Sequence, residues 1–147
     1  MRKADAKVKT VLLVEDYEDS RRMLARLLEM CGYRVLEAAD GSEAVRIAER
    51  GCPDVVLMDL QMPVTDGFTA TSRIRRIDSI CRVPVIAVSA QPADEFASAA
   101  ALVGCDRFVS KPIDFDLLLE VIRECTERAV THTAARHEVR TVGQLSV

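Results

Sequence analysis

Four short apolar runs in this chain lead directly into a side chain that can take part in chemistry. They are Thr10–Val14 before Glu15 and Asp16, Asp54–Met58 before Asp59, Val83–Ser89 with its terminal hydroxyl, and Arg107–Val109 before Ser110 and Lys111. Most residues within the runs favour β-strands. Polar groups placed where a strand ends are available to a ligand. The pattern therefore indicates strands that carry a functional site as well as a core.

Segments with helical periodicity separate these runs. We expect helices from about Asp19 to Gly32, from Asp40 to Gly51, from Asp66 through Ile77, from Ala93 to Val103, and from Asp114 onward, with a further strand at Arg34–Ala38. Strands that alternate with helices in this way are joined by right-handed crossovers and lie parallel. The sequence thus predicts an α/β fold, a doubly wound five-stranded parallel sheet with helices on both faces.

Ligands of open parallel sheets lie beyond the carboxyl ends of the strands, at the switch point of the strand order. The four strand endings should therefore meet in one site that contains the carboxylates of Glu15, Asp16 and Asp59, the hydroxyl of Ser89 and the ammonium of Lys111. Clustered carboxylates repel one another, and an all-oxygen site of this kind suits Mg²⁺. With that charge neutralised, the Asp59 carboxylate can act as a nucleophile toward a phosphoryl group. Taken singly, each residue has an ordinary alternative as a helix cap or surface ion pair, but their joint occurrence argues against that explanation.

Length and charge narrow the class of protein. The 147 residues fit one domain, which we place at residues 10–130, after an N-terminal arm of residues 1–9 and before a polar tail of residues 131–147 that we expect to be flexible. The net charge of −3 disfavours direct nucleic-acid binding. Five scattered cysteines fit reduced thiols, and no apolar run is long enough for a membrane span. We expect a soluble, cytoplasmic protein without a membrane partner, and assign no role to His132 and His137.

The motifs together resemble the receiver domain of response regulators, the CheY-like family of two-component signalling. The resemblance rests on Glu15-Asp16, the block from Asp59 to Gly67, Ser89-Ala90 and Lys111-Pro112, and it covers about residues 10–126. It implies a flavodoxin-like strand order of 2-1-3-4-5. It also implies that Asp59 accepts phosphate from a histidine kinase or a histidine phosphotransfer protein, and that the phosphorylated domain acts on a downstream protein target.

The resemblance also implies roles for individual residues. Glu15, Asp16, Asp59 and the carbonyl of Gln61 would bind Mg²⁺, Ser89 and Ala90 would face the phosphoryl group with Lys111, Phe108 would turn inward when Ser89 moves, and the Lys111–Pro112 bond would be cis. Four residues depart from the common pattern: Glu15 stands where the family often has Asp, Phe108 stands where it commonly has Tyr, and Val64-Thr65 lie in a variable part of the loop.

Rival functions are tested by the same residues. A flavodoxin-like flavin binder needs a phosphate-binding loop after the first strand, where this chain has acidic residues. A haloacid-dehalogenase-type phosphatase needs a second acid at the position of Gln61. We therefore expect a signalling phosphoacceptor and not an enzyme, with self-phosphorylation and self-dephosphorylation as its only reactions. A protein-docking module of receiver fold that works without phosphorylation is the alternative.

Two further expectations concern turnover and output. Gln61 and Gln91, each two residues past a site residue, should influence how long the phosphoryl group survives. The last helix carries a second apolar row, Leu117, Val121 and Cys125, beyond what packing on the sheet requires. Either the helix lies deeper than usual, or this row is a face for a partner or for a phosphorylation-dependent homodimer.

Overall fold

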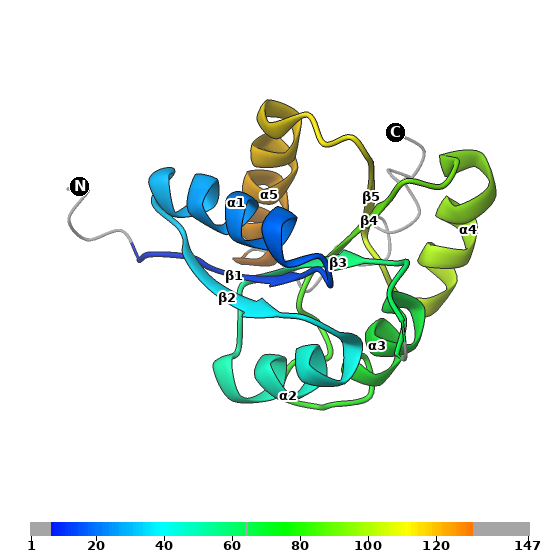
Figure 1. Cartoon of the computed structure of the whole chain (residues 1–147). Helices are drawn as coiled ribbons and strands as arrows, with labels where there is room; N and C mark the ends of the chain where they lie inside the picture. The colour runs from blue at the N-terminus through cyan, green and yellow to red at the C-terminus, as the bar shows by residue number, and fades with distance from the viewer. Residues whose placement is uncertain (1–6, 64, 131–147) are drawn as a thin grey trace.

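Five strands alternate with five helices in the computed structural model, which describes residues 7–63 and 65–130 (Figure 1). The strands are β1 (Thr10–Val14), β2 (Arg34–Ala38), β3 (Val55–Asp59), β4 (Val85–Ser89) and β5 (Arg107–Ser110). The helices are α1 (Glu18–Met30), α2 (Gly41–Gly51), α3 (Gly67–Ile74), α4 (Ala93–Val103) and α5 (Phe115–Val130). The tail at residues 131–147 and its two histidines lie outside the described residues.

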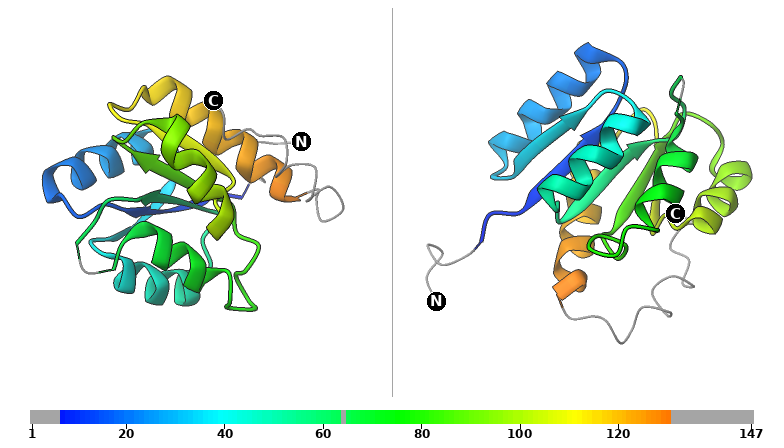
Figure 2. Two further views of the ribbon diagram at one scale, coloured as in Figure 1. Left: turned by 90° about the vertical axis from the view of Figure 1, so that its right-hand side faces the viewer. Right: turned by 90° about the horizontal axis from the view of Figure 1, so that it is seen from below.

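The strands form one parallel sheet in the order β2-β1-β3-β4-β5. Helices α1 and α5 cover one face of it, and α2, α3 and α4 cover the other (Figures 1 and 2). The expected doubly wound α/β fold and its strand order are therefore confirmed. The order reverses between β1 and β3, so the carboxyl ends of these two strands border the switch point.

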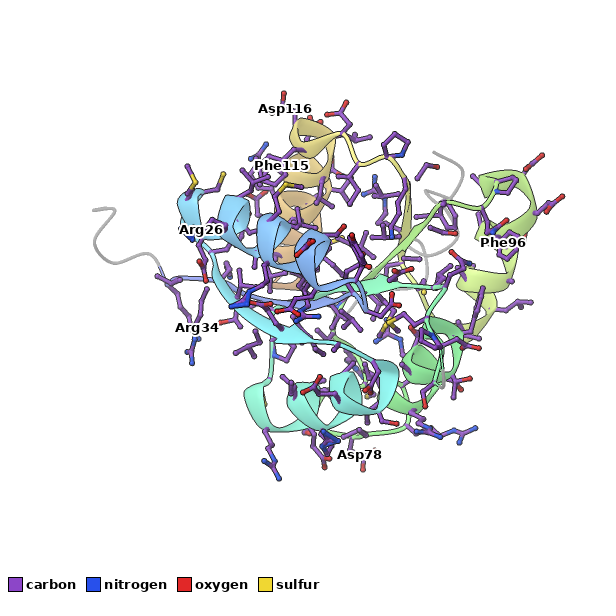
Figure 3. The ribbon with its side chains drawn as sticks, viewed as in Figure 1. Arg26, Arg34, Asp78, Phe96, Phe115 and Asp116 are labelled. Carbon is purple, nitrogen blue, oxygen red and sulfur yellow. The ribbon has the colours of Figure 1, made fainter. Side chains whose placement is uncertain are left out.

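Two apolar cores flank the sheet, because alternate residues of each strand point to opposite faces. In β1, Val11 and Leu13 pack toward α1 and α5, whereas Leu12 and Val14 pack toward α2 and α3. Burial on both faces explains why the strands read as continuous apolar runs. On the α4 side, the ring of Phe68 in α3 lies with its centroid 6.5 Å from that of Phe96 in α4, so the pair connects the two helices. Phe96 is labelled in Figure 3.

The element boundaries differ from the expected ones at several places, among them the start of α1, the start of β3 and the end of α3. Helix α1 begins one residue earlier, at Glu18, and its first residues receive no side-chain cap from Tyr17. Strand β3 starts after Asp54, whose carboxylate instead accepts the N–H of Thr10 at 2.7 Å. Helix α3 stops at Ile74, and the chain then tightens into turns in which Arg76 and Ile77 bond to carbonyls three residues back. Two predicted caps are present, since Asp40 accepts the N–H of Glu43 and Asp66 that of Thr69, each at 2.8 Å.

Helix α5 corrects the expectation of a partner face. Val121 and Cys125 are only 4% and 7% exposed and belong to the core beneath α5. Leu117, at 42% exposed, is the one member of this row that reaches solvent. The helix lies deep against the sheet and so buries most of its wide apolar arc; Phe115 and Leu119 also pack against the same core. Phe115 is labelled at the start of α5 in Figure 3. Among the described residues, no helix is long and apolar enough to cross a membrane.

Candidate functional site

The carboxyl ends of β1, β3, β4 and β5 bring the expected polar groups to one edge of the sheet. Asp59 and Ser89 are the last residues of their strands, and Lys111 follows β5 directly. Main-chain bonds hold these ends in register: Leu60 N–H donates to the Val88 carbonyl at 3.0 Å, and Lys111 N–H donates to the Ser89 carbonyl at 2.8 Å. The ladder of parallel strands thus places residues from distant parts of the sequence in one small volume.

Three carboxylates form the acidic part of the site. Glu15, Asp16 and Asp59 each offer an oxygen, and these oxygens all lie within 4.8 Å of one another. The three differ in exposure, because Asp16 faces solvent, Glu15 is half-buried and Asp59 is buried. An all-oxygen set open to water on one side fits a hard cation such as Mg²⁺, which keeps several of its waters. These residues therefore fit a metal ion.

Asp59 is the most enclosed of the acids, with 4% of its surface exposed. Its Oδ1 accepts the main-chain N–H of Gln61 at 3.0 Å, and its Oδ2 accepts from Lys111 Nζ at 3.2 Å. Lys111 Nζ also donates to Glu15 Oε1 at 3.2 Å. One ammonium thus serves two carboxylates, so the cluster has more negative than positive charge.

This excess of negative charge, together with burial, shifts the pKa values of Asp59 and Lys111. The pKa of Asp59 is raised from 3.8 to about 6, because burial, helped by the charge of Glu15, outweighs the opposing effects of the nearby Lys111 ammonium and the Gln61 N–H. Burial by itself would lower the pKa of Lys111, but Asp59 and Glu15 outweigh that effect and raise this pKa. At neutral pH the site therefore contains an ionised, poorly solvated carboxylate beside a permanently charged lysine. Such a group favours a cation or a reaction that removes its charge.

Ser89 lies fully buried at the end of β4. Its Oγ donates to Gln61 Oε1 at 2.7 Å and accepts the main-chain N–H of Gln91 at 2.9 Å. The side chain of Gln61 thus points to the Ser89 hydroxyl, whereas the Gln91 side chain belongs to an exposed residue. Sequence reasoning placed both glutamines beside the site but did not foresee that Gln61 joins β3 to β4 through its side chain.

The remaining expected residues surround this centre. Phe108 is 3% exposed and packs in the core on the α2, α3 and α4 side, so its ring already points inward. Ala90 is exposed next to Ser89. The Lys111–Pro112 peptide bond is cis, as the resemblance implied.

The supporting roles of two residues near the site, Arg21 and Gly67, were not predicted from the sequence. Arg21 of α1 donates to the Glu15 carbonyl at 3.1 Å and to Glu37 Oε1 at 3.0 Å, so it connects the acidic loop with β2. Gly67 lies so close to the Asp59 carbonyl and Leu60 that any side chain there would collide with main chain. Gly67 stood in the recognised block, but nothing distinguished Arg21 from its neighbours Arg22 and Arg26.

Comparison with known proteins gives consistent matches. The model of the response regulator receiver domain family matches residues 11–123. The polar-differentiation response regulator DivK of Brucella anthropi is 33% identical over 115 residues, which span 78% of this chain and 94% of that protein.

Solved structures agree in fold. A sensor histidine kinase receiver domain from Pseudomonas aeruginosa, with a magnesium ion coordinated in its active-site cleft, matches with a TM-score of 0.76 and 34% identity over 82% of this chain and 99% of that one. The chemotaxis protein CheY4 of Vibrio cholerae matches with a TM-score of 0.77 and 28% identity, over 81% of this chain and 99% of that one.

Proposed function

Because this chain belongs to the response regulator receiver domain family, we propose that Asp59 accepts a phosphoryl group from a histidine kinase or a histidine phosphotransfer protein. Receiver domains of this family work in two-component signalling, between such phosphate donors and downstream proteins. The observation that carries the proposal is the placement of Asp59, a buried carboxylate in contact with Lys111 and beside two further acids.

The chemistry is an in-line transfer. An oxygen of the Asp59 carboxylate attacks phosphorus and forms the new P–O bond as the P–N bond to the donor histidine breaks. The bonding electrons leave with the imidazole nitrogen, and the product is an aspartyl phosphate. Lys111 Nζ, 3.2 Å from Asp59 Oδ2, is placed to donate to a transferred oxygen.

A magnesium ion held by Glu15, Asp16, Asp59 and the Gln61 carbonyl would neutralise the charge of the carboxylates and of the phosphoryl oxygens. The support for it is the observed meeting of three carboxylates and the magnesium in the matched kinase receiver domain. The protein's own part is to hold Asp59 in contact with the Lys111 ammonium and shielded from water on most sides.

We further propose that the chain is a signalling phosphoacceptor and not an enzyme acting on a separate turnover substrate. Self-dephosphorylation then occurs when water attacks the aspartyl phosphate, at a rate to which Gln61 and Gln91 contribute from the border of the site. Output follows from a change in the arrangement of Ser89 and Phe108, to which a downstream partner or a second copy binds more tightly.

Labelling with acetyl phosphate tests the phosphoacceptor. In the presence of Mg²⁺ the wild-type chain should take up one phosphoryl group, with acetate as the leaving group, and Asp59→Asn should take up none. Asp116→Asn, at an exposed acid at the start of α5, is the matched control and should be labelled like the wild type.

The outcome distinguishes the alternatives. Stoichiometric phosphate on Asp59→Asn would place the phosphoacceptor elsewhere. A folded wild-type chain that takes up no phosphate, and binds the same partners whether or not acetyl phosphate is present, would favour a docking module that works without phosphorylation.

A further inference from the structure

The hydroxyl of Ser89 is already engaged on both sides in this structure. Its Oγ accepts the Gln91 N–H at 2.9 Å and donates its proton to Gln61 Oε1 at 2.7 Å. Ser89 is fully buried, so its hydroxyl is shielded from water. A serine hydroxyl carries a single proton. The proton that a phosphoryl oxygen would need is therefore occupied by the Gln61 side chain.

Gln61 also contacts the nucleophile. Its main-chain N–H donates to Asp59 Oδ1 at 3.0 Å, two residues back, while its side chain reaches across to the end of β4. The main-chain pairing of β3 with β4 closes with the bond from Leu60 N–H to the Val88 carbonyl. The Gln61–Ser89 bond lies just past that point and extends the connection with side chains. Gln61 is thus hydrogen-bonded to Asp59 through its main chain and to Ser89 through its side chain.

We propose that Gln61 is a positioning residue: its side chain accepts the Ser89 hydroxyl proton in the resting state, and a phosphoryl group on Asp59 has to compete with Gln61 for that hydrogen bond. The inference rests on the proposed phosphorylation of Asp59. Because Ser89 has one proton, its bond to Gln61 Oε1 and a bond to a phosphoryl oxygen exclude each other. The Gln61–Ser89 bond therefore stabilises the resting arrangement. The stronger this bond is, the smaller is the fraction of phosphorylated molecules in which Ser89 contacts the phosphoryl group.

The exchange is favourable for two reasons. A phosphoryl oxygen carries negative charge, and hydrogen bonds to charged acceptors are stronger than those to a neutral amide. Gln61 is only half-buried, so water can solvate its amide after Ser89 leaves. The Ser89–Gln61 hydrogen bond thus forms in the unphosphorylated protein and is replaced by the stronger bond to a phosphoryl oxygen.

A double-mutant cycle tests the competition with beryllofluoride, a mimic of the phosphoryl group, bound in the presence of Mg²⁺ and followed by ¹⁹F NMR. Gln61→Met keeps the length of the side chain but has no oxygen to accept the Ser89 proton. It should bind beryllofluoride about two- to tenfold more tightly than the wild type, the factor that corresponds to one neutral hydrogen bond. In a Ser89→Ala background, where no proton is contested, the same change should leave the affinity unaltered.

A spectroscopic signal reports on the hydroxyl itself. The Gln91 amide donates to Ser89 Oγ, so its ¹H–¹⁵N resonance should move in unliganded Gln61→Met toward its position in the beryllofluoride-bound wild type. Gln61→Ala also lacks the acceptor and repeats both measurements, and urea denaturation checks that every variant is folded.

The results separate this inference from the function on which it rests. Unchanged affinity in Gln61→Met, or equal tightening with and without the Ser89 hydroxyl, would overturn the competition while the proposed function stands. A folded wild-type chain that binds no beryllofluoride would overturn the proposed function, and the competition with it.

Discussion

Asp59 illustrates how one residue can be costly for the fold and necessary for the site. Its carboxylate is almost fully enclosed, and a single ammonium is shared between it and Glu15. Burial accordingly raises the pKa of Asp59 to about 6. An acid whose pKa is higher in the folded chain than in the unfolded chain destabilises the fold once it ionises.

The pH dependence of stability should reveal this cost. Between pH 3.8 and about 6 the folded chain holds the Asp59 proton that the unfolded chain has lost, so stability falls as the pH rises through this interval. Asp59→Asn carries no such charge. In metal-free buffer it should be about 3 kcal/mol more stable than the wild type at pH 7 and nearly equal to it at pH 4, since one pKa unit corresponds to roughly 1.4 kcal/mol and the pKa rises by about two units.

Urea denaturation of both proteins at several pH values measures the difference. Asp116→Asn, at an exposed carboxyl group away from the site, is the control for the Asp-to-Asn substitution itself. A difference between Asp59→Asn and the wild type that stays constant from pH 4 to pH 7 would contradict the assignment of the cost to Asp59 ionisation.

The identities of the site residues could be read from the sequence, but several of their contacts could not. Asp59, Ser89 and Lys111 each follow a recognisable strand, and the parallel sheet brings strand ends together. The bond from Ser89 to Gln61 depends on a side-chain rotamer and on the path of the loop after β3. The contact of Arg21 with Glu15 and Glu37 likewise depends on how α1 is oriented over the sheet. Neither leaves a periodic pattern in the sequence.

At the scale of elements, the junction of β3 and α3 is unusually close. Gly67, the first residue of α3, lies against the Asp59 carbonyl and the Leu60 main chain. A methyl group there would have to push apart two main-chain segments, one of which carries Asp59 itself. Helix packing and the position of the nucleophile are therefore coupled through this glycine.

Gly67→Ala should therefore affect both stability and labelling. We expect a loss of about 1–3 kcal/mol in the free energy of unfolding, as for other overpacked sites, together with slower acetyl-phosphate labelling. Gly32→Ala is the matched control: Gly32 has a φ of 97° and open space around it, so an alanine costs about 1–2 kcal/mol through backbone strain alone. Its labelling rate should match the wild type. Equal labelling by both variants would show that Gly67 serves packing only.

Element boundaries were predictable where local chemistry decides them. Asp40 and Asp66 cap α2 and α3 as their positions indicated. The end of α3 was not predictable, because Arg75, which follows its last residue, is bound by groups distant in the sequence. Its guanidinium donates to the carbonyls of Gly104 and Val83, each at 2.6 Å. The second apolar row of α5 was open to two interpretations from the sequence, and only the depth at which the helix lies decided between them.

At the scale of the whole molecule, the site lies beyond the carboxyl edge of the one sheet that both cores share. Strands β1 and β3 contribute residues to the core beneath α1 and α5 as well as to the core beneath α2, α3 and α4. The same strands carry Glu15, Asp16 and Asp59 at their ends. Unfolding of either core would disperse the carboxylates, so occupation of the site should stabilise the complete domain.

Magnesium should therefore raise the global stability of the chain in a pH-dependent way. At pH 7 and a Mg²⁺ concentration ten times its Kd, the expected gain in the free energy of unfolding is about 1.4 kcal/mol. The gain should shrink below pH 6, where Asp59 becomes protonated and the cation has to displace that proton. Urea denaturation with Mg²⁺, compared with sodium chloride of equal ionic strength, measures it. Mg²⁺ should raise the free energy of unfolding of Asp116→Asn as much as that of the wild type, and that of Asp59→Asn by less. Equal gains in all three proteins would mean that Mg²⁺ stabilises the chain at some place other than the carboxyl edge of the sheet.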